Sequence, residues 1–263
     1  MSRILGAFFR ALLVAVVIAA PSYLVPDANR STQEISLIIG GLIAVFVLFE
    51  YAAPQPGLID FRYAPPYNRA RFAVFTAVLL LVTFYTRALA NADPFSADLL
   101  AFTDRLVRMA DFSLSPVAMA ASSLAPDGPG ELQQTIRGAA ALATASAGAG
   151  ALLFIVVLWL FGWPTQRTKF NLWANLPSLD PNSNRPVERR LARSGWLSLI
   201  AGLAFPFVAL AAASGARDMI DPNVFSRSLP LIWTSVLWAT GSALLVLRGA
   251  AILKIARLVS KAR

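Results

Sequence analysis

Six apolar stretches alternate with polar segments along the chain. A helix needs about 20 mostly apolar residues to cross the hydrocarbon core of a bilayer. These stretches are too long for strands and too apolar on every side for surface helices. They predict an all-α, polytopic membrane protein with six transmembrane helices in a single membrane-embedded domain over residues 1–263. The predicted spans are Leu5–Val25, Ile35–Ala53, Phe72–Ala90, Ala139–Trp163, Trp196–Gly215 and Leu229–Leu253.

The composition strengthens this prediction and removes several kinds of chemistry. Hydrophobic residues make up 57% of the chain and charged residues only 14%, whereas soluble domains carry about 25% charged residues. The chain contains no cysteine and no histidine. Disulfides, cysteine nucleophiles, histidine bases and zinc sites built from these residues are therefore excluded.

The charges are distributed unevenly between the polar segments. If the N-terminus lies inside, most of the 23 Lys and Arg residues fall on the inner side and most of the 14 acidic residues on the outer side. The positive-inside rule then predicts that both termini are cytoplasmic. The preference for Arg over Lys is typical of a GC-rich bacterial genome and indicates a bacterial cytoplasmic membrane. An alternative is that the first stretch is a signal peptide cleaved near Ala19–Ala20, although Pro21 argues against cleavage there.

The predicted outer segment, residues 91–137, is long for a simple connector. Phe95, Leu99, Phe102, Leu106 and Met109 recur at helical spacing and predict an amphipathic helix from about Pro94 to Asp111, capped by Asp93. This periplasmic helix either covers the bundle or serves as a lid or partner-binding face. In the preceding outer loop, Ser31 and Glu34 have the spacing of a capping box for the second span.

The two predicted inner loops, residues 54–71 and 164–194, combine basic and aromatic side chains with several prolines. Such side chains are typical of the head-group layer of a membrane, where they contact anionic lipids. A sharper hypothesis is that the loops are a rigid docking surface for a protein partner. The candidate contact residues are Arg62, Tyr63, Tyr67, Arg69, Arg71, Arg167, Lys169, Phe170, Trp173, Arg189, Arg190 and Arg193.

Two further features concern the packing of the spans. Glu50, Arg10 and Arg248 lie at similar predicted depth near the inner side, so we hypothesise that Glu50 pairs with one of the two arginines. The fourth span is rich in small residues at four-residue spacing, which predicts close helix contact. This candidate packing face comprises Ala139, Ala143, Ala147 and Ala151, together with Ala140, Thr144 and Gly148.

No motif in the sequence identifies an activity. We find no nucleotide-binding, hydrolase or metalloprotease signature, and so predict no catalytic residue, no metal and no cofactor. The leading hypothesis is a non-enzymatic accessory, assembly or scaffold subunit whose partners are anionic lipids and other membrane proteins, not nucleic acid. A small-solute facilitator or channel is the alternative, and a membrane-bound enzyme is a weaker one.

Overall fold

The computed structural model describes residues 2–54, 57–164, 171–176, 186–216, 219 and 221–261. Every regular element in these residues is helical, and six helices are long and apolar enough to cross a membrane. The all-helical class and the six candidate spans are thus confirmed. The six are α1 (Ser2–Leu24), α2 (Arg30–Ala52), α3 (Tyr67–Ala90), α6 (Gly130–Leu160), α8 (Val187–Gly215) and α9 (Ser228–Lys261). Shorter elements are α4 (Pro94–Met109), α5 (Pro116–Leu124), α7 (Leu172–Asn175) and the 3₁₀ helix η2 (Pro222–Ser226).

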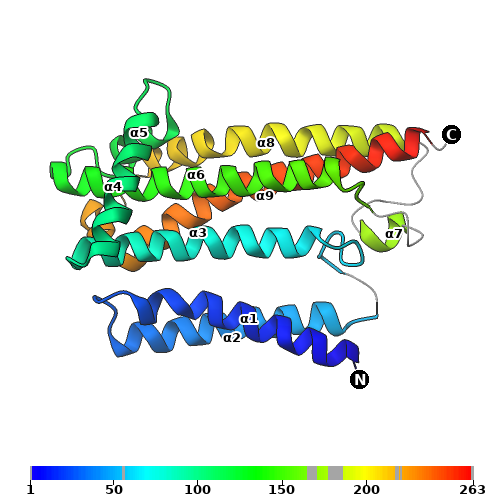
Figure 1. The fold of residues 1–263 in the computed structure, drawn as a ribbon, viewed down its shortest axis with the longest axis horizontal. Coiled ribbons are helices and arrows are strands. Elements are labelled where there is room, and N and C mark those ends of the chain that lie inside the picture. Colours follow the sequence, from blue (N-terminus) through cyan, green and yellow to red (C-terminus); the bar gives the residue numbers. More distant parts are fainter. Residues whose placement is uncertain are drawn as a thin grey trace.

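The long helices run roughly along one axis, with α9 packed against α3, α6 and α8 (Figure 1). Helices α1 and α2 form a hairpin beside α3, and α2 packs mainly on α1. Both chain termini lie at the same end of the bundle, together with the loop before α3 and with α7. We call this the terminal end; α4 and α5 lie at the opposite end.

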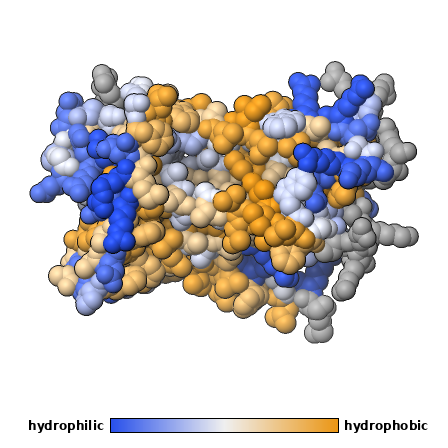
Figure 2. Space-filling view, turned by 45° about the horizontal axis from the view of Figure 1, so that its top comes forward, coloured by the Kyte–Doolittle hydropathy of each residue, from blue (hydrophilic) through white to orange (hydrophobic). Residues whose placement is uncertain are grey.

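An apolar belt crosses the middle of the face seen in Figure 2, and hydrophilic residues gather toward the two ends of the molecule. Large apolar side chains are exposed in this belt, for example Leu42 on α2 and Leu203 on α8, with 67% and 68% of their surface accessible. Exposed apolar surface of this extent would be costly in water but suits a lipid environment. The chain therefore has the features of a multi-pass membrane protein.

Several helices extend beyond the apolar stretches that predict them. Helix α3 begins at Tyr67, and α6 begins at Gly130. Helix α8 begins at Val187, within the predicted inner loop and before the fifth predicted span. Hydropathy detects only the apolar part of a helix, while backbone hydrogen bonding continues into its polar turns. The capping box was placed wrongly: Asn29 caps α2 by accepting a hydrogen bond from the Thr32 N–H at 2.9 Å.

Helix α4 begins where the sequence predicts, but of its predicted apolar face only Leu99 and Leu106 pack against the core. Asp93 caps it by accepting hydrogen bonds from the N–H (3.0 Å) and hydroxyl (2.7 Å) of Ser96. These bonds hold the pKa of Asp93 below its ordinary value. Ser96 and Thr103 are buried, whereas Phe95, Phe102 and Met109 are exposed. The buried hydroxyls donate locally, to Asp93 and to the Leu99 carbonyl at 2.8 Å, so burying them leaves no unsatisfied donor.

The alanine face of α6 forms part of the core. Ala139, Ala143, Ala147 and Ala151 are all buried, and α6 packs against α3 and α9. The parallel row of Ala140, Thr144 and Gly148 runs from a buried position outward to an exposed one.

Pro206 lies inside α8, and side chains of α9 bond the backbone of α8 around it. Proline has no N–H, so the Gly202 carbonyl one turn earlier lacks its helical donor. The Ser242 hydroxyl of α9 donates to that carbonyl at 2.7 Å, and Trp238 Nε1 donates to the Pro206 carbonyl at 3.1 Å. The Ser242 bond satisfies the Gly202 carbonyl, which would otherwise be unpaired in an apolar setting, and the Trp238 bond adds a second contact between α8 and α9.

Candidate functional site

Glu50, near the end of α2, organises the loop that follows it. Its Oε1 accepts hydrogen bonds from the N–H groups of Gly57, Leu58 and Ile59 at 2.7, 3.0 and 3.1 Å. The side chain is buried, with 9% of the residue exposed. Three N–H groups converging on one carboxylate oxygen stabilise its charge without a partner cation in direct contact. Glu50 therefore holds the backbone of residues 57–59 in one conformation.

This geometry shows that the predicted ion pair between Glu50 and Arg10 or Arg248 is wrong. Arg248 instead forms an ion pair with Asp60 at 2.9 Å and donates to the Ser198 hydroxyl at 3.0 Å. Arg10 donates to the Gly6 carbonyl at 2.7 Å. The prediction failed because it compared depths along the spans and ignored the loop, whose backbone and Asp60 reach back to these side chains.

Arg62 fastens the same loop to the C-terminus of α2. Its guanidinium donates to the carbonyls of Glu50, Tyr51 and Ala53, the last two at 2.8 and 2.7 Å. The last carbonyls of a helix have no partner within it, and a cation there also interacts favourably with the helix dipole. Arg62 is thus a structural cap for α2, and only part of its side chain remains accessible.

An aromatic cluster packs the loop against the segment that follows α6. Phe61, Tyr67 and Trp163 are all fully buried, with the ring centroid of Phe61 4.6 Å from that of Tyr67 and 5.5 Å from that of Trp163. Trp163 Nε1 donates to the Ala64 carbonyl at 3.2 Å. Because Tyr67 is buried, its predicted contact with lipid head groups is wrong.

Phe61 is the most unusual backbone position of the loop. Its φ of +57° lies in the left-handed region, which non-glycine residues rarely adopt. The Asn175 carbonyl of α7 accepts the Phe61 N–H at 2.6 Å, and the Asn175 side chain accepts the Tyr63 N–H at 3.1 Å. The strained conformation is held by these contacts. Sequence reasoning missed Phe61 and Trp163, because neither has a local pattern that distinguishes it from other apolar residues.

The other predicted contact residues have different positions. Arg69, Arg189 and Arg193 are exposed, Tyr63 is about half exposed, and Arg71 and Arg190 are partly buried. Trp173 belongs to α7. Arg167, Lys169 and Phe170 lie outside the described residues.

A second basic and aromatic group lies where α6 and α9 end. Lys254 Nζ and Arg257 Cζ of α9 lie 4.6 and 4.8 Å from the ring centroid of Trp159 on α6. Cations at this distance are attracted to the face of an indole ring. No local sequence pattern distinguishes these three residues, which come together only because α6 and α9 pack side by side.

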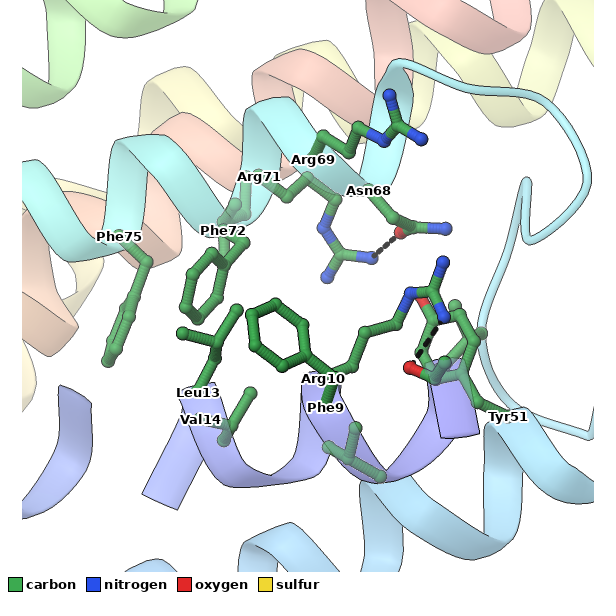
Figure 3. Close-up of a pocket in the computed structure, with 14 residues that line it drawn as sticks. Phe9, Arg10, Leu13, Val14, Tyr51, Asn68, Arg69, Arg71, Phe72 and Phe75 are labelled. Atoms are coloured by element: carbon green, nitrogen blue, oxygen red, sulfur yellow. Dashed lines mark hydrogen bonds between the residues drawn. The ribbon is translucent and has the colours of Figure 1, made fainter. Parts of the chain in front are cut away.

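A cleft of about 570 Å³ separates the α1–α2 hairpin from α3 near the terminal end (Figure 3). Phe9, Leu13 and Val14 of α1 face Phe72 and Phe75 of α3 across it. Arg10, Tyr51 and Arg71 line its polar part. The cleft is thus apolar along one side and cationic at one end.

Comparison of the chain with protein-family models, with curated proteins and with solved structures finds no match of any of the three kinds. Function must therefore be argued from the geometry. Among the residues that the structure describes, the loop of residues 57–66, the cleft and the Trp159 group each bring charged and aromatic side chains together.

Proposed function

We propose that this protein is a non-enzymatic accessory, assembly or scaffold subunit of a bacterial cytoplasmic membrane. Its termini and the loop of residues 57–66 would face the cytoplasm, and the exposed residues of this loop would dock a partner protein. The uneven distribution of Lys and Arg supports this orientation. The observation that carries the proposal is the order of the loop.

A rigid loop loses little conformational entropy on binding and is therefore suited to recognition. Four sets of contacts hold the loop in place: those of Glu50, of Arg62, of the Phe61–Tyr67–Trp163 cluster and of Asn175. This framework leaves the side chains of Leu58 and Tyr63 accessible, at 75% and 48% of their surface. Tyrosine supplies a large contact area at low entropic cost and is common at the energetic centres of interfaces.

The interior of the bundle favours this proposal over a solute facilitator. A polar path would need hydroxyls that face a common space. Thr83, Thr86 and Thr240 are buried and each donates to a carbonyl of its own helix, at 2.7, 2.9 and 2.6 Å. Hydroxyls bonded in this way are part of helix packing and offer little to a passing solute.

The test is affinity purification of the tagged full chain from native membranes after cross-linking, with quantitative mass spectrometry. We expect one partner at near-stoichiometric yield, cross-linked to the loop of residues 57–66. The double variant L58Q/Y63Q should reduce that yield by about tenfold, as expected for an interface centre.

The matched control is the double variant F112Q/L114Q, which also replaces one aromatic residue and one leucine, both exposed, but at the opposite end. It should leave the yield unchanged. The proposal is refuted if the wild-type protein is recovered without a stoichiometric partner, or if both double variants reduce the yield equally.

A further inference from the structure

The cleft between the α1–α2 hairpin and α3 has the chemistry of a lipid-binding site. Its volume of about 570 Å³ lies within the range of roughly 300–1,000 Å³ typical of small-molecule sites. The apolar side, with three phenylalanines, extends along α1 and α3. The cationic end lies near the terminal end of the bundle. A ligand that fits would be apolar along most of its length and anionic at one end.

Two guanidinium groups define the cationic end. Arg10 of α1 and Arg71 of α3 extend into the space between the two helices, whereas Arg69 points away from it (Figure 3). Arg10 lies 5.0 Å from the ring centroid of Tyr51, and Arg71 lies 5.6 Å from that of Tyr67. The aromatic rings hold the cations in place but do not neutralise them.

Neither arginine has an anionic partner among the residues that the structure describes. Two acidic residues of this region are already engaged, Glu50 by three backbone N–H groups and Asp60 by Arg248. Arg71 donates only a long bond, 3.5 Å, to the Asn68 side chain, and its Nε is buried without any hydrogen-bond partner. A buried donor of this kind costs free energy unless something accepts its hydrogen bond.

We propose that the cleft binds one anionic phospholipid, with its phosphate between Arg10 and Arg71 and an acyl chain along Leu13, Phe72 and Phe75. Arginine is the preferred residue for phosphate, which it contacts with paired donors. The lipid phosphate would accept hydrogen bonds from the terminal N–H groups of both arginines and neutralise their charge. It would also fill the space between the hairpin and the rest of the bundle. This proposal goes beyond the proposed docking function and does not depend on it.

The test is native mass spectrometry of the full chain in detergent micelles, titrated with dioleoyl-phosphatidylglycerol. Dioleoyl-phosphatidylcholine and free glycerol phosphate are the comparison ligands. We expect a single phosphatidylglycerol to bind, and phosphatidylcholine, which has no net negative charge, to bind about tenfold more weakly or less. Glycerol phosphate should also bind at least about tenfold more weakly, because it lacks the chain that contacts the apolar side.

The variant R10Q/R71Q should weaken phosphatidylglycerol binding by about tenfold or more. The control R87Q removes one positive charge from the opposite end of α3 and should bind like the wild type. If R10Q/R71Q fails to fold, the comparison of the three ligands on the wild type still decides the question. Equal binding of the two lipids, equal binding of glycerol phosphate, or unchanged binding by R10Q/R71Q would overturn the proposal.

Discussion

The clearest prediction concerns Glu50, whose carboxylate accepts three backbone hydrogen bonds from Gly57, Leu58 and Ile59. In the variant Glu50→Ala, all three donors lose their acceptor together. Glu34 provides a matched control, because it belongs to the same helix but pairs with Arg30 at the surface, where 61% of its side chain is exposed.

The expected size of the effect follows from the contacts. A hydrogen bond to a charged group contributes about 1.5–3 kcal/mol. The three bonds share one oxygen, and the freed N–H groups regain some water near the surface, so the sum is far from additive. We therefore expect Glu50→Ala to lower the free energy of unfolding by about 3 kcal/mol. Glu34→Ala breaks an exposed helical pair and should cost about 0.5 kcal/mol or less.

Hydrogen exchange measured by mass spectrometry gives the most direct readout, because it reports on the opening of individual segments. A loss of about 3 kcal/mol corresponds to roughly a hundredfold faster exchange of the amides of Gly57–Ile59, since each 1.4 kcal/mol is a factor of ten. Glu34→Ala should leave their exchange unchanged. If these amides exchange at the wild-type rate in Glu50→Ala, the argument that the carboxylate orders the loop is wrong.

Two further predictions concern α6 and α4. A Cβ atom added at Gly138 would collide with the Tyr85 ring and hydroxyl, whereas one added at Gly148 meets nothing within 4 Å. Gly138→Ala should therefore lower the free energy of unfolding in detergent by about 1–3 kcal/mol through overpacking. The control Gly148→Ala should not lower it. Equal effects of the two variants would contradict the close approach of α3 and α6. For α4, the folded-state pKa of Asp93 lies below its ordinary value of 3.8, so the cap contributes fully above that value and is lost as the pH falls through the folded-state pKa. In acid, the Ser96 amide of the wild type should then exchange faster than the Ser96 amide of the variant Asp93→Asn, whose side chain caps the helix without titrating. If the variant shows the same response to acid as the wild type, the response does not come from the Asp93 carboxylate.

The local features of this chain could be predicted from the sequence because they depend on nearby residues. Six apolar stretches predict six candidate spans, and Asp93 with Pro94 predicts the start of α4. The four-residue spacing of small residues predicts close helix packing of α6, although not which of its two rows is buried. Each of these signals lies within a few turns of one helix, so no knowledge of the neighbouring elements is needed.

The tertiary structure decided the partners of the charged and aromatic side chains. Asp60, 188 positions away in the sequence, and not Glu50, pairs with Arg248, and Trp163 meets a carbonyl 99 positions away. It also decided that α4 buries Ser96 and Thr103 and leaves two phenylalanines exposed. Contacts between distant segments depend on how the helices pack and on where the loops return. A single sequence therefore revealed which residues carry charge at the terminal end, and only the fold showed that, within the described part of the chain, Arg10 and Arg71 have no anionic partner.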